Sequence, residues 1–301
     1  MIPIFPKFKK LELSDREHIE KITSKHAPHS DYNFLSMWSW DVRQEMEISQ
    51  LYNNLVVKFS HYITSEPFFS FLGNINQHQT AETLLEFSKD KNLCPALSLV
   101  PAESIESLDP KKFIIKPDEA NFDYIYELSN ISLYPGRKFG DKRTMVNSFL
   151  KNYSSAVVKI FNLTDLDCQK SIITLNNNWL KNKAKIDENF KIKNEFIATE
   201  KFLSSNFHDA IGIGIFIDKK LIAYSIFNLT SDNYAVAHFS KADIAYDGVY
   251  EYLMRECATI LLDLNCKFLN YQQDLGLSGL KQSKKSFRPT HYLKKYMVQK
   301  I

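Results

Sequence analysis

The residue best suited to chemistry is an aspartate near the end of the sequence, in the stretch NYQQDLGLSGLKQSKKSFRPTHYLKKY. Asp274 follows the apolar segment KFLN, and strand alternation would place it on the same face as Gln272. A carboxylate at the open end of a strand can hold an ammonium group or orient a nucleophilic amine. We therefore expect Asp274 to be catalytic and Gln272 to contact a substrate.

Basic residues follow Asp274 at helical spacing. Ser278 is a suitable N-cap, and Pro289 would end the helix. Residues three and four positions apart lie on one side of a helix, which predicts one basic face of Lys281, Lys284, Lys285 and Arg288. We expect Lys281, Lys284 and Arg288 to bind phosphate. A solvated face of an ordinary surface helix is the alternative interpretation.

A second basic cluster occupies a turn in LYPGRKFGDKRTMVNSFL. Gly136 and Gly140 lie in this turn, and four cations surround them: Arg137, Lys138, Lys142 and Arg143. Several cations on a turn that opens a helix suit a phosphate backbone or an anionic head group. The alternative is a solvated turn in which Asp141 neutralises one charge.

Two further candidates end the strand AVAHFSKAD. His238 is a secondary candidate for catalysis and Lys241 for substrate binding, although a single strand histidine is more often structural. The sequence has no GxSxG elbow, no Walker loop, no Rossmann fingerprint and no Cys/His metal spacing. We therefore expect no metal, no cofactor and no protein nucleophile.

Composition narrows the class of protein. The 301 residues are 44% hydrophobic and 13% aromatic, which favours a packed core over disorder, and a net charge of +3 is too even to indicate nucleic-acid binding by itself. No stretch approaches the roughly 20 uncharged apolar residues that span a bilayer. Four widely spaced cysteines suit a reducing compartment. We expect a cytoplasmic protein without an integral membrane segment, with peripheral membrane contact left open.

The predicted helices and strands occur in a similar order in the two halves of the sequence, and they would position these residues. In the second half we expect strands over residues 154–163, 211–218, 220–229, 233–241, 267–273 and 292–301, and helices over 167–183, 188–205, 248–264 and 278–287. This is the element order of the GNAT N-acyltransferase fold. The first half shows a similar order more weakly, and residues 121–153 are predicted to form a helix, a basic turn and a second helix. We expect domains at 1–130 and 131–301.

The GNAT fold offers a test for coenzyme A. Its pyrophosphate site is written Arg/Gln-x-x-Gly-x-Gly/Ala, because small residues let phosphate reach free amides at a helix N-terminus. In DIAYDGVYEYL, Gly248 could be the first glycine, but Ala245 and Tyr250 occupy the other positions, and Asp247 would repel phosphate. We expect a turn and helix cap here, and acetyl-CoA is disfavoured as donor.

Three stretches together resemble a known bacterial family of uncharacterised proteins, which share the C-terminal domain of phosphatidylglycerol lysyltransferase. They are FDYIYELSNISLYPGRKFGDKRTMVNSF, HFSKADIAYDGVYEYL and the stretch around Asp274. The last is the most specific, with matching intervals at Gly276, Leu280, Lys284, Phe287, Pro289 and Tyr296. The resemblance implies an α+β protein with two tandem GNAT-like domains, each a mixed, mostly antiparallel sheet flanked by helices.

The resemblance also implies an activity. The lysyltransferase moves an aminoacyl group from a charged tRNA to a phosphatidylglycerol hydroxyl, so aminoacyl-tRNA would be the donor here and an anionic phospholipid or a small amine or hydroxyl compound the acceptor. Its amine-recognising acid would fall near Asp274. The lysyltransferase has a transmembrane half that this sequence does not contain, which leaves the acceptor open. Two alternatives stay open: a CoA-dependent N-acyltransferase, and a non-catalytic protein that binds RNA or anionic lipid.

Overall fold

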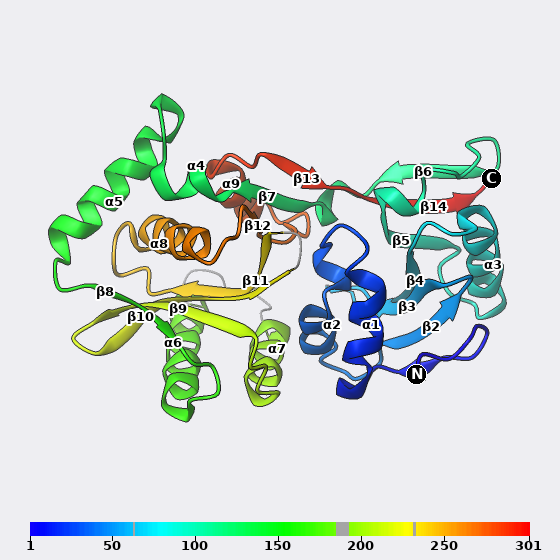
Figure 1. The fold of residues 1–301 in the computed structure, drawn as a ribbon, viewed down its shortest axis with the longest axis horizontal. Helices are drawn as coiled ribbons and strands as arrows, with labels where there is room; N and C mark the ends of the chain where they lie inside the picture. Colours follow the sequence, from blue (N-terminus) through cyan, green and yellow to red (C-terminus); the bar gives the residue numbers. More distant parts are fainter. Residues whose placement is uncertain (63, 185–192, 231–232) are drawn as a thin grey trace. The chain divides into compact units, whose positions relative to one another are not determined.

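A computed structural model describes residues 1–62, 64–184, 193–230 and 233–301 (Figure 1). The chain forms two compact units. The first comprises Met1–Tyr124, Gln272–Lys284 and His291–Ile301, and the second comprises Ile125–Tyr271 and Lys285–Thr290. Each unit is built on a mixed sheet flanked by helices, so the predicted α+β architecture with two similar halves is confirmed.

The first sheet is mostly antiparallel. Its order is β1-β2-β3-β4-β5-β14-β6, and β4 and β5 form its parallel pair. The strands are β1 (Lys9–Lys10), β2 (Glu47–Leu51), β3 (Asn54–Ser60), β4 (Pro67–Leu72), β5 (Ala96–Pro101), β6 (Phe113–Pro117) and β14 (Lys295–Lys300). The helices of this part are α1 (Arg16–Thr23), α2 (Phe34–Trp40) and α3 (Gln77–Asp90).

Apolar spacing on α3 explains how the first core closes. Ala81, Leu84 and Leu85 recur at helical intervals and are buried against strand residues such as Phe69 and Leu97. Leu84 is fully buried and Leu85 is 4% exposed, so this face of α3 closes the core.

The second sheet has the order β13-β7-β12-β11-β10-β9-β8. Its strands are β7 (Asp123–Glu127), β8 (Val157–Phe161), β9 (Ala210–Ile217), β10 (Lys220–Leu229), β11 (Tyr234–Ala242), β12 (Phe268–Asn270) and β13 (His291–Leu293). Strands β11 and β12 run parallel, and their pairing ends at Val236 and Asn270. The chain therefore leaves the ladder shortly before Asp274.

Helices cover both faces of this second sheet. In Figure 1, α8 (Val249–Asp263) lies on one face, and α6 (Leu166–Ala184) and α7 (Lys193–Ser204) lie on the other. The remaining helices are α4 (Leu128–Leu133), α5 (Gly140–Asn152) and α9 (Ser278–Ser286). The predicted helix at 248–264 matches α8. Residues 188–192 of another predicted helix lie outside the described residues, as do residues 231–232 between two predicted strands.

Two predictions about elements were wrong. The segment before the basic turn begins as strand β7, because Tyr124, Ile125 and Tyr126 are strand formers that become buried beside β12. The last strand, β14, pairs with β5 and β6 in the first sheet, and its Val298 joins the first core. The second unit is therefore not the contiguous segment 131–301 that we expected. A strand's own pattern does not specify its partners, which is why the sequence could not reveal this placement.

Candidate functional site

The carboxylate of Asp274 is held at both of its oxygens. Oδ2 accepts a hydrogen bond from the Tyr124 hydroxyl at 2.6 Å, and Oδ1 accepts one from the backbone N–H of Gly276 at 2.8 Å. The residue is 1% exposed, and the neighbouring segment 276–279 is exposed, so the carboxylate lies one layer beneath the surface of the first unit. Its orientation is therefore set by the protein and not by solvent.

The backbone at Asp274 is a corner and not a strand. β12 ends at Asn270, and the residues around the corner include Gln272, Leu275 and Gly276, with φ of 58°, 55° and 73°. Strand alternation does not continue through such a corner, so the predicted shared face of Gln272 and Asp274 was wrong. Gln272 is half-buried, whereas the side chain of Gln273 is buried.

Tyr124 contacts the Asp274 carboxylate, and Tyr292 and Lys284 lie beside the Tyr124 ring. Burial, and then the hydrogen bond to Asp274, raise the pKa of Tyr124, so its hydroxyl keeps its proton and donates. The rings of Tyr124 and Tyr292 meet edge-on at 5.0 Å, and burial followed by the charge of Asp274 raises the pKa of Tyr292. The ammonium of Lys284 lies 5.7 Å from the centre of the Tyr124 ring.

The predicted basic face of α9 is wrong at two of its four residues, whereas Lys285 is exposed as predicted. Lys284 is only 5% exposed and packs inward on Tyr124, and Leu280 is 37% exposed. Arg288 lies beyond the end of α9 with φ of 57° and is exposed. Lys281 is half-buried on the helix. The aromatic ring and the amphipathic stem of lysine explain why an inward lysine is tolerated here.

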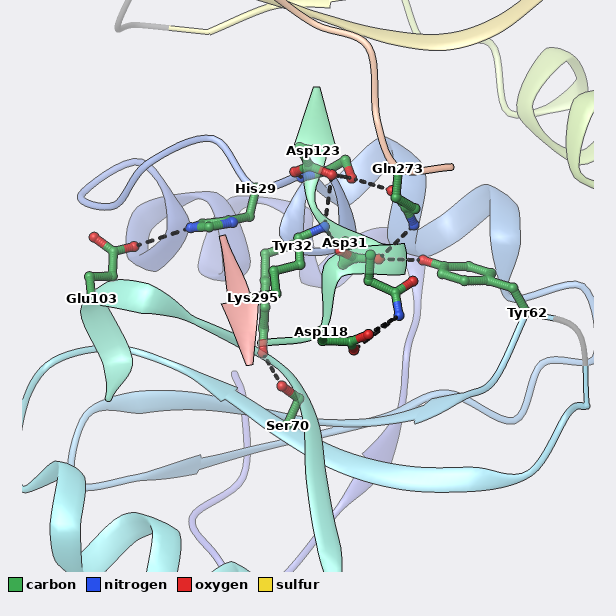
Figure 2. Close-up of polar contacts among 12 residues, drawn as sticks. His29, Asp31, Tyr32, Tyr62, Ser70, Glu103, Asp118, Asp123, Gln273 and Lys295 are labelled. Carbon is green, nitrogen blue, oxygen red and sulfur yellow. Dashed lines mark hydrogen bonds and ion pairs between the residues drawn. The ribbon is translucent and has the colours of Figure 1, made fainter. Parts of the chain in front are cut away.

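A buried ionic network lies beside this corner in the first unit (Figure 2). Lys295 donates from Nζ to Oδ2 of Asp31 and to Oδ1 of Asp123, the latter at 2.7 Å, and all three side chains are fully buried. Burial lowers the pKa of Lys295, but the charges of Asp123 and Asp31 outweigh it and hold that pKa above its usual value. Sequence reasoning missed this network. Its one signal was the Lys294–Lys295 pair, of which strand alternation must turn one lysine inward.

His238 is a buried sheet residue of the second unit. Its Nε2 lies 2.8 Å from Oδ1 of Asn228, and its ring packs on Phe202 at 5.3 Å. Burial lowers the pKa of His238 to about 3, so the ring is neutral near pH 7 and Nε2 donates to Asn228. These contacts match the structural interpretation of this histidine.

Lys241 is also engaged. Its Nζ donates to Oε1 of Glu195 at 2.6 Å and lies 4.4 Å from the centre of the Trp179 ring. The Lys241 side chain is 11% exposed. An anionic substrate would therefore have to compete with Glu195 for this ammonium.

Two of the four cations of the basic turn bind other parts of the second unit. Arg143 donates to the carbonyl oxygens of Tyr134 and Gly136, which closes the turn between α4 and α5. Lys142 donates to Glu251 at 3.0 Å and lies 3.9 Å from the centre of the Phe287 ring. These contacts hold residues 285–290 against α5 within the second unit.

Arg137, Lys138 and Arg288 are exposed in that unit, and so is Arg143, although its guanidinium donates to two carbonyl oxygens of the turn. The candidates thus fall into two groups, one in each unit. Asp274, Gln272, Lys281 and Lys284 belong to the first, and His238, Lys241, Arg288 and the four cations of the basic turn belong to the second.

The glycine that could have marked a coenzyme A loop serves packing. Gly248 is the N-cap of α8 with φ of 80°, and a Cβ atom there would lie 2.4 Å from the carbonyl oxygen of Met145. The first turn of α8 also carries Glu251. The absent side chain therefore admits the backbone of α5, and a carboxylate stands where a phosphate would need positive charge.

Within the described ranges, no group of three His, Cys, Asp or Glu residues has metal-binding geometry. No helix in the same ranges is long and apolar enough to cross a bilayer.

Comparisons with known proteins agree with the fold. The chain is 25% identical to a conserved protein of unknown function from Bacteroides thetaiotaomicron, with a TM-score of 0.84 over 99% of both chains. It also superposes on L-PGS from Bacillus licheniformis, with 10% identity and a TM-score of 0.65 over 97% of this chain and 92% of the other. An uncharacterized protein of Mycoplasmoides gallisepticum is 23% identical over 95% of this chain and 96% of its own length.

The family model described as phosphatidylglycerol lysyltransferase, C-terminal, matches residues 23–299. That match spans nearly all of both units, including the Asp274 corner, the buried network and the basic turn. The chain belongs to the phosphatidylglycerol lysyltransferase C-terminal family.

Proposed function

We propose that this protein transfers an aminoacyl group from a charged tRNA to a hydroxyl or amine of a small acceptor, with an anionic phospholipid head group as the first acceptor to test. Membership of the lysyltransferase family supports the reaction class. The observation that carries the proposal is the Asp274 carboxylate, fixed at Oδ1 by Gly276 and at Oδ2 by Tyr124. A carboxylate has about four acceptor positions, so the two that remain can receive the N–H groups of an ammonium.

Asp274 would act by holding the α-ammonium of the donor. The acceptor oxygen or nitrogen attacks the ester carbonyl carbon, a new acyl bond forms, and the bond to the tRNA ribose oxygen breaks. The acceptor's proton passes to that oxygen. The ester is already activated, so positioning and charge placement can supply most of the rate.

Exposed cations would contact the phosphates of the tRNA. Arg137 and Lys138 are exposed on the turn between α4 and α5, and Arg288 is exposed in the same unit. Replacing both Arg137 and Lys138 with Ser should weaken tRNA binding and lower the slope of log K against log salt by about 1.4 to 1.8. The matched control replaces exposed Lys116 and Lys170 with Ser.

Coenzyme A is not the donor in this proposal, because the backbone of α5 fills the space beside Gly248. The carboxylate of Glu251, in the first turn of α8, would also repel a phosphate. Excess acetyl-CoA should therefore leave the melting temperature unchanged, since a ligand of the native state must raise it. A clear rise would favour the CoA-dependent N-acyltransferase.

The decisive assay combines the purified chain, tRNA carrying a radiolabelled amino acid, and vesicles with or without phosphatidylglycerol. Label should move to the lipid or to an added small acceptor, and Asp274→Asn should lower the rate about a hundredfold, the effect of removing one charge from a buried pair. Asp263→Asn, at an exposed position at the end of α8, is the control. Full activity of Asp274→Asn would contradict the role of Asp274. Salt-dependent tRNA binding without turnover would favour the non-catalytic binding protein.

A further inference from the structure

The side chain of Gln273 is clamped between two buried residues of the first unit (Figure 2). Its Nε2 donates to Oδ1 of Asp31 at 3.1 Å, and its Oε1 lies 2.9 Å from the Ser30 hydroxyl. We propose that Gln273 is a positioning residue for Asp274, because this clamp holds the corner that carries the carboxylate. The inference rests on the proposed function.

The orientation of the Gln273 amide follows from its neighbours. Asp31 is paired with the Lys295 ammonium, and an ionised carboxylate only accepts hydrogen bonds. The NH₂ group of Gln273 must therefore face Asp31, which leaves its oxygen facing Ser30. The Ser30 hydroxyl has one hydrogen, which it shares between Gln273 and Oδ1 of Asp123 at 2.6 Å.

The residues that hold Gln273 make further hydrogen bonds of their own. Asp31 also accepts from the Tyr62 hydroxyl at 2.7 Å, and the backbone N–H of Ser30 donates to Asp123 at 2.7 Å. Lys295 ties both carboxylates together from β14. Gln273 therefore binds Asp31 and Ser30, which are far from it in sequence and are held by other residues.

The corner needs such an anchor, because it lies outside the sheet ladder. Gln272 and Leu275, on either side of the Gln273–Asp274 pair, have positive φ, a conformation that costs free energy for residues other than glycine. Two backbone bonds flank the pair, from Tyr124 to the Gln272 carbonyl at 3.1 Å and from Leu275 to the Ala120 carbonyl at 2.8 Å. The side-chain hydrogen bonds of Gln273 fix the chain between these two backbone bonds, at the residue next to Asp274.

A purely structural role can be separated from positioning, because the partners of Gln273 do not depend on it. In Gln273→Met, which keeps the side-chain length, Ser30 can give its hydrogen wholly to Asp123, and Asp31 keeps Lys295 and Tyr62. No buried polar group loses its last partner, so the urea midpoint of unfolding should stay close to that of the unmodified chain. The matched control is Gln282→Met, at an exposed position on α9.

The test compares two donors in the transfer assay: aminoacyl-tRNA, and the same tRNA with the α-amine converted to a hydroxyl. If Asp274 holds the ammonium, the unmodified chain prefers the amine donor in kcat/KM. Gln273→Met should lower that preference about fivefold, the effect of roughly one hydrogen bond, through a higher KM for the amine donor and an unchanged KM for the acceptor. Gln282→Met should change neither.

The outcomes separate this inference from the proposed function. If Asp274→Asn loses the donor preference and Gln273→Met keeps it in full, the clamp is structural only and the inference is overturned, while the proposed function stands. If Asp274→Asn transfers both donors as the unmodified chain does, the proposed function fails first. If Gln273→Met lowered kcat/KM equally for both donors and also lowered the urea midpoint, the positioning role of Gln273 would be overturned as well.

Discussion

The Tyr124 hydroxyl donates a 2.6 Å hydrogen bond to Oδ2 of Asp274, and the two residues are 150 positions apart in the sequence. Tyr124 lies in β7 and is 2% exposed, so the bond joins a sheet strand to the corner after β12. The strand thereby limits how far the carboxylate can turn.

Tyr124→Phe should therefore weaken both the fold and the site. The ring can still pack on Tyr292, but the buried carboxylate loses a donor, which should lower the free energy of unfolding by about 1 to 3 kcal/mol. Transfer should fall as well, because Asp274 is then held at Oδ1 alone. Urea unfolding and the transfer assay measure the two effects. Tyr52→Phe, at an exposed position, should change neither the free energy of unfolding nor the transfer rate. If Tyr124→Phe also left both unchanged, the hydrogen bond would not be needed.

Lys295→Met should be among the most destabilising single substitutions. It would leave Asp31 and Asp123 buried without their shared cation, at a cost of about 3 to 5 kcal/mol. Lys294→Met, at the exposed neighbouring position, serves as the control and should unfold at nearly the unmodified urea concentration. If both variants behaved alike, the network would contribute no stability.

The buried His238 should make the fold weaker in mild acid. Burial lowers its pKa from 6.5 to about 3, although the charge of Asp209 acts in the opposite direction. Between about pH 3 and pH 6.5 the unfolded chain therefore binds more protons than the folded chain. The free energy of unfolding is highest, as far as His238 is concerned, above about pH 6.5, and it decreases as the pH falls below that value.

At pH 5 the loss attributable to His238 should be about 2 kcal/mol relative to pH 7. His238→Gln can still donate to Asn228 but cannot titrate, so its free energy of unfolding should depend less on pH by about that amount. Urea unfolding at the two pH values tests this difference, and parallel pH dependence of both chains would contradict it.

Gly248→Ala should destabilise the second unit. The new Cβ would lie 2.4 Å from the Met145 carbonyl oxygen, and φ at this position is 80°. We expect a loss of at least about 1 to 3 kcal/mol, from overpacking and from the strained conformation. Gly279→Ala, on α9 with no atom within 4 Å of its Cβ position, should instead be neutral or stabilise by up to about 1 kcal/mol. A tolerated Gly248→Ala would remove the packing explanation for this glycine.

Local chemistry in the sequence determined most of the elements. The helix predicted at 248–264 is α8, the strands predicted at 211–218, 220–229 and 233–241 are β9, β10 and β11, and Gly248 is a helix cap. Such features depend on residue spacing, turn residues and caps within one segment, which is why they can be predicted without the rest of the chain. The acid of Asp274 could be selected in the same way, as the only carboxylate in its stretch.

Only the tertiary structure decided which charged residues are buried and what they touch. Lys284 and Lys295 look like their exposed neighbours in the sequence, yet one packs on Tyr124 and the other bridges Asp123 and Asp31, 172 and 264 positions away. A lysine is buried where distant carboxylates or aromatic rings compensate for its lost hydration. Here those partners lie on β7 and on the helical turn that contains Asp31, and neither element pairs with β14 or α9, so only tertiary packing brings them together. For the same reason, the local pattern could place β14 as a strand but could not reveal that it completes the first sheet.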